Sequence, residues 1–281
     1  MKAIKTIGGL AALSLTLTAM HTAYADTATA QQPVADAEKE LVSEEKSPLS
    51  ASFSMDVLSD YMWRGKICND NPVWQPSVTL GYDAGDYGAV SANVWSSFDL
   101  THKRGSATNS RRTSGLQEID YTLSYAVELF GVGFEVGHIW YTFPNNNGSS
   151  DQDLYATVSY DNPIVTPSAS VYWNYLDSAG NDVSTLYYTF GLGHDFAITG
   201  ELTLTPSASL GFGGNAWTGC GTELTDQTVG LSASYAISEN VSLGAQINYT
   251  WIPSHTLRKD DYMGAGKDQL CWGGFNVTVS F

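Results

Sequence analysis

Hydrophobic and polar residues alternate one by one along most of the chain after about residue 52. The last seven positions show the pattern most simply, because apolar side chains take the odd positions 275–281 and polar side chains the even positions between them. Successive side chains of a β-strand point to opposite faces, so the pattern predicts a strand with one apolar and one polar face. A tilted strand that crosses a membrane takes about ten residues, and the alternation recurs in segments of that size.

Twelve such segments follow one another: 52–64, 74–82, 88–98, 116–129, 132–142, 153–160, 167–175, 184–194, 201–212, 227–235, 241–251 and 270–281. The connections between them alternate between short ones, such as 83–87 and 130–131, and mostly longer ones, such as 99–115 and 252–270. Short turns on one side and long loops on the other are typical of outer-membrane barrels. The sequence therefore predicts an all-β fold, a transmembrane antiparallel up-and-down β-barrel of about 12 strands whose last strand pairs with its first.

Both ends of the chain fit export to a bacterial outer membrane. Residues 1–25 have two lysines, a short apolar run and an Ala-Tyr-Ala site, which is the pattern of a secretory signal peptide. Residues 26–50 are rich in alanine and charge and are expected to form a flexible acidic periplasmic leader, with the barrel in residues 51–281. The terminal Phe281 resembles the closing residue of outer-membrane barrels, so we expect the barrel-assembly machinery to bind this strand.

Composition narrows the class of partner. Without the two signal-peptide lysines, the chain has 13 − 2 = 11 basic residues against 29 acidic residues, a formal charge of about −18. This balance argues against nucleic acid as a partner and favours a surface that attracts cations. Seven of the eight tryptophans fall near strand ends on the long-loop side, where indole rings would form a girdle at the membrane interface. Neither cysteine nor histidine spacing suggests a metal site, and no cofactor is expected.

The segment Ser59-Asp60-Tyr61-Met62-Trp63-Arg64-Gly65, followed by Asn71-Pro72-Val73-Trp74-Gln75-Pro76 and Gly81-Tyr82, resembles the opening of the TorF-like porin family. The resemblance implies a Gram-negative outer-membrane barrel. After Gly65 the sequence departs from the family, because Lys66-Ile67-Cys68 replaces a polar run.

The polar faces of the predicted strands line the lumen and divide into two walls. One wall is acidic, with Arg64 near it and expected to pair with one of its carboxylates; the other is mostly Ser, Thr, Asn and Gln. The acidic residues are Asp56, Asp60, Glu118, Asp120, Glu128 and Glu135. Rings of carboxylates favour cations, so the lumen is expected to prefer cations weakly.

The loop 99–115 is the one basic patch, with Lys103, Arg104, Arg111 and Arg112. It would either fold into the pore as a constriction that attracts anions or lie against lipopolysaccharide phosphates. Among the three cysteines, Cys68 and Cys271 lie at the outer ends of strands that closure makes neighbours, so they are the favoured disulfide, with Cys220 as the competitor.

Two functions remain open. The favoured one is a porin-like channel for passive diffusion of small solutes or ions across the outer membrane, in contact with its lipid and lipopolysaccharide. The alternative is a plugged, non-conducting barrel with an adhesive or envelope-structural role. An enzyme is not expected, because His138 and His194 have lipid-facing parity but the neighbouring lipid-facing positions offer no serine nucleophile.

Overall fold

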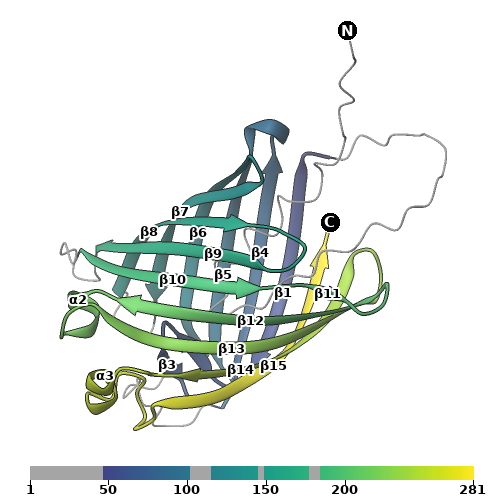
Figure 1. Cartoon of the computed structure of the whole chain (residues 1–281). Helices are drawn as coiled ribbons and strands as arrows, with labels where there is room; N and C mark the ends of the chain where they lie inside the picture. Colours follow the sequence, from purple (N-terminus) through teal and green to yellow (C-terminus); the bar gives the residue numbers. More distant parts are fainter. Residues whose placement is uncertain (1–46, 102–114, 145–148, 177–183) are drawn as a thin grey trace, which may run out of the picture.

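The structure is a computed structural model of the whole chain, and it describes residues 47–101, 115–144, 149–176 and 184–281. Twelve antiparallel strands form a closed barrel (Figure 1). In chain order they are β1 Leu49–Leu58, β4 Val73–Asp83, β5 Ala89–Asp99, β6 Leu116–Leu129, β7 Val132–Phe143, β8 Ser149–Tyr160, β9 Thr166–Leu176, β10 Thr185–Gly193, β12 Leu202–Gly213, β13 Glu223–Ala236, β14 Val241–Trp251 and β15 Gln269–Ser280. The predicted fold is confirmed.

Six shorter elements join or accompany the barrel strands. They are β2 Tyr61–Trp63, β3 Lys66–Asn69, the 3-10 helix η1 Gly85–Tyr87, β11 Phe196–Ala197, α2 Asn215–Thr218 and α3 His255–Lys259. Among the described residues, no helix has the length and apolar character that crossing a membrane would require.

The barrel closes through the strand pair that the sequence predicts. β1 and β15 run antiparallel in continuous register from Ser52 opposite Ser280 to Leu58 opposite Gly274. Beyond this ladder, the Phe281 amide donates to the Ala51 carbonyl at 2.8 Å. Because the sheet has no free edge in the ring, its backbone groups are satisfied by neighbouring strands, which a membrane interior requires.

Alternation of side chains along the strands gives the wall an apolar outside and a polar inside. On β6, Leu123 is 58% exposed while its neighbour Ser124 is 5% exposed, and on β7, Val136 is 53% exposed beside Glu135 at 2%. Exposed apolar residues continue around the wall on the other strands. Such a surface is stable in lipid rather than in water, and the protein is an outer-membrane β-barrel.

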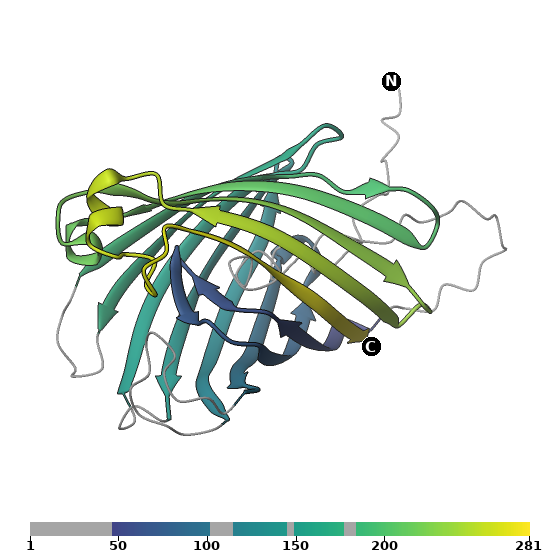
Figure 2. The same cartoon turned by 90° about the horizontal axis from the view of Figure 1, so that it is seen from below.

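The two ends of the barrel differ. We call the end where Ala51 pairs with Phe281 the inner end. The strands are joined there by short turns, such as the two-residue turn between β6 and β7 formed by Phe130 and Gly131, whose φ angles are 58° and 78°. At the outer end lie α2, α3 and the β2–β3 hairpin (Figures 1 and 2). Outer-membrane barrels place their short turns in the periplasm, so the outer end faces the exterior.

The prediction that the first strand covers residues 52–64 is wrong for its outer half. β1 stops at Leu58, and residues 61–69 form a separate hairpin, β2–β3, that lies inside the barrel (Figure 2). The cause is the turn at Arg64 and Gly65, whose φ values of 50° and 77° reverse the chain. Two successive positive φ angles are those of a type I′ hairpin turn, and glycine adopts them most readily.

Candidate functional site

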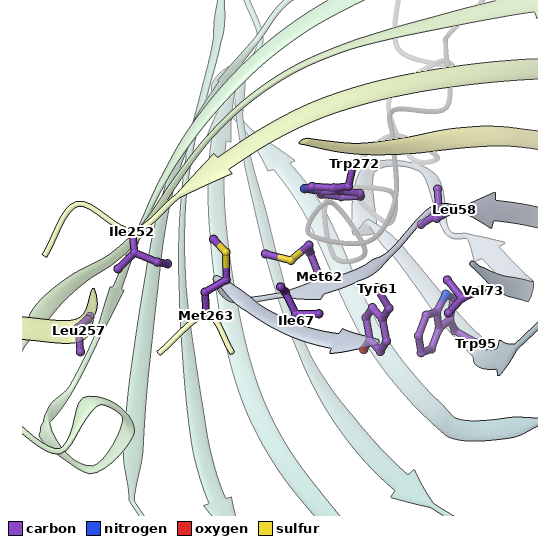
Figure 3. Close-up of a cluster of buried hydrophobic side chains, with 10 residues drawn as sticks. All are labelled: Leu58, Tyr61, Met62, Ile67, Val73, Trp95, Ile252, Leu257, Met263 and Trp272. Atoms are coloured by element: carbon purple, nitrogen blue, oxygen red, sulfur yellow. The ribbon is translucent and has the colours of Figure 1, made fainter. Parts of the chain in front are cut away.

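The β2–β3 hairpin is anchored in the outer half of the lumen by an apolar core. Tyr61, Met62 and Ile67 of the hairpin are 4%, 3% and 1% exposed. They pack with side chains from the barrel wall and from the outer loop that contains α3 (Figure 3), namely Leu58, Val73, Trp95, Ile252, Leu257, Met263 and Trp272. Three tryptophans of the predicted interface girdle, Trp63, Trp95 and Trp272, therefore lie in the barrel interior instead.

The tip of the hairpin ends in a buried ion pair. The Arg64 Nη2 atom donates to Asp153 Oδ2 on β8 at 2.6 Å, and the two side chains are only 4% and 0% exposed. Asn174 Nδ2 on β9 donates to the other carboxylate oxygen at 2.9 Å, and the Tyr141 hydroxyl donates to Oδ2 at 3.3 Å. The Asp153 carboxylate is thus held by the wall itself and meets the guanidinium in a charge-assisted hydrogen bond.

Aromatic rings surround the same guanidinium. Its Cζ atom lies 4.5 Å from the ring centroids of Trp63 and Tyr172, 4.9 Å from that of Tyr187 and 5.4 Å from that of Trp217. A cation within about 6 Å of an aromatic ring face is attracted by the ring quadrupole, more strongly where water is excluded. The environment of Arg64 is therefore one carboxylate and four rings, three of which belong to the wall or to α2.

The wall rings form a ladder across three strands. Tyr155 on β8, Tyr172 on β9 and Tyr187 on β10 are register neighbours, with ring centroids 5.9 Å and 6.2 Å apart. The Tyr155 hydroxyl donates to Glu135 Oε1 at 2.6 Å, and the Tyr187 hydroxyl donates to Asp226 Oδ1 at 2.9 Å. Each tyrosine therefore presents its ring to the lumen, and the hydroxyls of Tyr155 and Tyr187 each donate to a carboxylate of the wall.

The outer loop with α3 holds the hairpin from above. The Tyr262 hydroxyl donates to the Arg64 carbonyl at 3.1 Å, and the Ile67 amide donates to the Met263 carbonyl at 2.8 Å. Lys66 Nζ lies 4.6 Å from the Trp217 centroid and 4.8 Å from that of Tyr262. Burial lowers the pKa of Lys66 from its usual value, because removing the ammonium from water penalises its charged form.

Gly65 brings the tip against a second buried carboxylate. A Cβ atom at this position would lie 2.8 Å from Asp226 Cβ and 3.0 Å from Asp226 Oδ1. Asp226 is fully buried; its Oδ1 atom accepts from Thr225 and Tyr187, whereas Oδ2 has no hydrogen-bond partner within the described part of the chain. The tip therefore sits between two carboxylates, Asp153 on β8 and Asp226 on β13.

Most of the predicted acidic residues do face the lumen, but they do not hold Arg64. Asp56, Glu118 and Glu135 are buried within the barrel, Asp60 borders the hairpin at 9% exposure, and Asp120 is half-buried. Glu128 is exposed at the inner end of β6. The expectation that Arg64 pairs with one of these six residues is wrong, because the hairpin carries it across the lumen to Asp153.

Asp153 and Asp226, which contact the hairpin tip, are not among the residues predicted from the sequence. Asp153 has the opposite parity to Leu154, Ala156 and Val158, so the alternation alone could have placed it in the lumen. Asp226 lies on β13, which begins at Glu223, four residues before the predicted strand. In the described residues, no group of three or more His, Cys, Asp or Glu side chains could hold a metal ion.

The predicted disulfide between Cys68 and Cys271 is absent from the structure, where both residues are thiols. Cys68 belongs to β3 and packs against the interior apolar core, whereas Cys271 is exposed on the outer face of β15. The barrel wall separates them because Cys271 and Trp272 have opposite parity and it is Trp272 that points inward. The basic residues Lys103, Arg104, Arg111 and Arg112 lie outside the described residues.

Comparison with known proteins places the barrel among outer-membrane folds. An outer membrane channel from Pseudomonas putida F1 is 11% identical, with a TM-score of 0.52 over 86% of this chain and 100% of that chain. Outer membrane phospholipase A from Escherichia coli is 16% identical, with a TM-score of 0.46 over 82% of this chain and 92% of that chain. The NanC porin is 12% identical, with a TM-score of 0.46 over 83% and 98% of the two chains.

A comparison with the curated proteins finds no match. A family profile, described as a bacterial protein of unknown function (Gcw_chp), matches residues 42–262, from before β1 to the loop after α3. Since this match covers most of the barrel and the whole β2–β3 hairpin, the chain belongs to the Gcw_chp family.

Proposed function

We propose that the protein is a porin-like outer-membrane channel for passive diffusion of small solutes or ions. The observation that carries this proposal is the polar lumen on the inner side of the hairpin, where hydroxyl side chains hydrogen-bond across strands, as Ser91 does with Ser124 and Thr157 with Ser170, each at 2.8 Å. Twelve strands about 4.8 Å apart and tilted by about 40° give a backbone diameter of about 24 Å, with roughly 10–14 Å between side chains. A lumen of this width and polarity suits hydrated solutes.

The acidic wall supports a weak cation preference as part of this proposal. Asp120 on β6 lies near Glu118 on the same strand and Asp153 on β8, Glu135 lies farther toward the inner end on β7, opposite Ala126, and Asp226 on β13 adds a carboxylate on the other side of the barrel. Fixed carboxylates raise the local concentration of cations in a narrow passage and lower that of anions.

In this proposal the structure is a closed form, and the hairpin is the gate. The hairpin crosses the outer half of the lumen, and its residues Tyr61, Met62 and Ile67 are nearly inaccessible. It is a short element, however, that is covalently connected to wall strands only at its two ends, and its other contacts are non-covalent. Leu58 and Val73, which flank it, are register partners of the β1–β4 ladder, so the barrel wall is continuous without it.

The second candidate function is a plugged barrel with an adhesive or envelope-structural role. The observation that favours it is the same apolar core, because Leu58, Val73, Trp95 and Trp272 of the wall bury their side chains against the hairpin. Burying large apolar side chains contributes about 1.5–3 kcal/mol each, so the docked hairpin would be the resident state.

Single-channel conductance in planar bilayers separates the two. The informative variant replaces residues 59–72 by a two-residue Asn-Gly turn, which can join Leu58 to Val73 because these residues already face each other. The channel proposal expects brief openings in the wild type and long-lived openings in this variant. Folded variant protein that never conducts would refute the channel and leave the plugged barrel.

Further expectations belong to the same proposal. The likeness of residues 59–65 to the TorF-like porins supports it, and that segment includes β2 and the turn of the hairpin. We propose that lipid and lipopolysaccharide surround the barrel, with the basic residues of loop 99–115 at the phosphates or at the pore, and that the assembly machinery binds the strand ending at Phe281.

We also propose that the protein is not an enzyme. His138 Nε2 lies 3.1 Å from Gln152 Oε1 and 3.0 Å from the Tyr175 hydroxyl, and the His194 ring packs on Phe196 with centroids 4.7 Å apart. A hydrolase of this architecture needs a serine nucleophile bonded to histidine. Release of fatty acid from phospholipid by the purified protein would contradict this expectation.

A further inference from the structure

The surroundings of the Arg64 side chain have the composition of a binding site for an organic cation. We define the Arg64 seat as Asp153, Tyr172, Tyr187 and Trp217. These four residues lie on β8, β9, β10 and α2, so all of them come from the barrel rather than from the hairpin. They supply one carboxylate at 2.6 Å and three ring faces at 4.5–5.4 Å from the guanidinium.

The seat is held in place by contacts that do not involve Arg64. Asp153 accepts hydrogen bonds from Asn174 and Tyr141, and the Tyr172 ring packs between those of Tyr155 and Tyr187. The Trp217 indole donates to the Tyr262 hydroxyl. Residues fixed by their own neighbours keep their geometry when the occupant leaves, as a preorganised binding site requires.

Two buried carboxylates lie at the hairpin tip and Arg64 pairs with one of them, while Lys66, whose Nζ atom lies 4.6 Å from the Trp217 centroid, is a second cation there. Asp153 is paired with the guanidinium, but Asp226, next to Gly65, is fully buried and its Oδ2 atom lacks a hydrogen-bond partner among the described residues. An anion or a neutral sugar in the seat would leave Asp153 buried without a counter-charge, which is costly. A cation that replaces Arg64 would keep Asp153 paired with a positive charge.

We infer that the Arg64 seat is a ligand site for small organic cations with a guanidinium or comparable planar cationic head, and that Arg64 is its tethered occupant. Such a ligand exchanges with Arg64, so its binding releases the hairpin tip. Rings favour weakly hydrated organic cations, whereas Na⁺ and K⁺ prefer oxygen ligands. That the ligand also passes through the barrel rests on the channel function proposed above; binding itself does not.

Because the hairpin holds Arg64 close to the seat, it sets the ligand concentration that is needed to compete with the Arg64 side chain. A group on a short tether has an effective concentration in the millimolar range or above, so the wild type should respond weakly to free guanidinium. Removing the arginine side chain removes this competitor. For a fragment of this size with one ion pair and stacked rings, we expect half-saturation at about 1–10 mM.

The experiment uses guanidinium chloride as the probe on the folded, detergent-solubilised protein at constant ionic strength, with NaCl as the balancing salt. Binding is followed by tryptophan fluorescence, to which Trp217 of the seat and the neighbouring Trp63 contribute. Arg64→Ala should bind guanidinium at least about 10-fold more tightly than the wild type. The matched control, Arg258→Ala, removes an exposed arginine on α3 and should behave as the wild type.

Two further variants keep the test decisive. Adding Asp153→Asn to Arg64→Ala should abolish the guanidinium response. If Arg64→Ala fails to fold, Gly65→Ala replaces it, because its Cβ would clash with Asp226 and lift the tip while every seat residue remains. A response to guanidinium no larger than in Arg258→Ala, in whichever variant folds, overturns the proposal.

Conductance distinguishes failure of this inference from failure of the channel function. If Arg64→Ala channels conduct but are not blocked by millimolar guanidinium, the channel function stands and the cation site is refuted. If the protein binds guanidinium saturably but never conducts, the cation site stands and the channel function is refuted.

Discussion

The ion pair at the hairpin tip gives the sharpest test of the gate. Asp153→Asn keeps the shape of the side chain and leaves one oxygen, which can still accept from Asn174, but it removes the charge that Arg64 meets at 2.6 Å. In the docked state the guanidinium would then be buried without its counter-ion. We therefore expect the hairpin to undock while the barrel wall remains folded.

The size of the effect follows from the burial of both partners. Breaking a buried pair by removing one partner costs about 3–5 kcal/mol. The contacts of Arg64 with Tyr172 and Tyr187 are unchanged by the substitution, so they do not offset this cost. A loss of about 3 kcal/mol lowers the docking equilibrium constant by roughly 150-fold.

Planar-bilayer recordings measure this loss as open probability, which should rise by about two orders of magnitude unless it saturates. Arg64→Met leaves Asp153 unpaired and should open the channel as well. The double variant, Arg64→Met with Asp153→Asn, buries no unpaired charge. Its increase in open probability should therefore be smaller than the sum of the increases in the two single variants, compared as free energies. If folded Asp153→Asn opened no more often than the wild type, the ion pair would not hold the gate.

Three further outcomes are expected. Glu118→Gln combined with Asp120→Asn should shift the reversal potential in a salt gradient toward zero, because it removes two lumen carboxylates; an unchanged potential would refute their role in selectivity. Deletion of Phe281, whose amide bonds to Ala51 at the seam, should reduce the yield of heat-modifiable folded barrel more than it changes the conductance of the folded fraction; normal insertion would contradict the role of the closing strand. In the native protein, a lipid-soluble maleimide should label Cys271 on the outer face but not Cys68 in the interior core; a Cys68–Cys271 cross-link on a non-reducing gel would contradict the structure.

The barrel was predictable from the sequence because a strand that faces lipid on one side and a polar lumen on the other must alternate with period two. Residues 116–129 illustrate this, since the predicted segment and β6 have the same bounds. The pairing of the last strand with the first also followed, because a sheet without free edges must close.

The same rule failed at residues 59–65. Tyr61 and Trp63 continue the odd-numbered apolar pattern of β1, so alternation extended the strand through them. In the structure both Tyr61 and Met62 are buried, which a two-faced wall strand does not allow and an internal hairpin does. The local signal was the turn pair Arg64-Gly65, but only positive φ at both positions decides it.

The sequence by itself determined the wall: which segments cross the membrane, which faces meet lipid and which line the lumen, because these depend on local periodicity and on the chemistry of the two surroundings. Only the tertiary structure decided what the lumen contains. The partner of Arg64 is Asp153, 89 residues away in the chain, and three of the four rings around its guanidinium come from β9, β10 and α2. Such contacts depend on how the strands curve into a closed ring, which brings one inward-folded hairpin within reach of the opposite wall, and no local pattern in the chain records that distance.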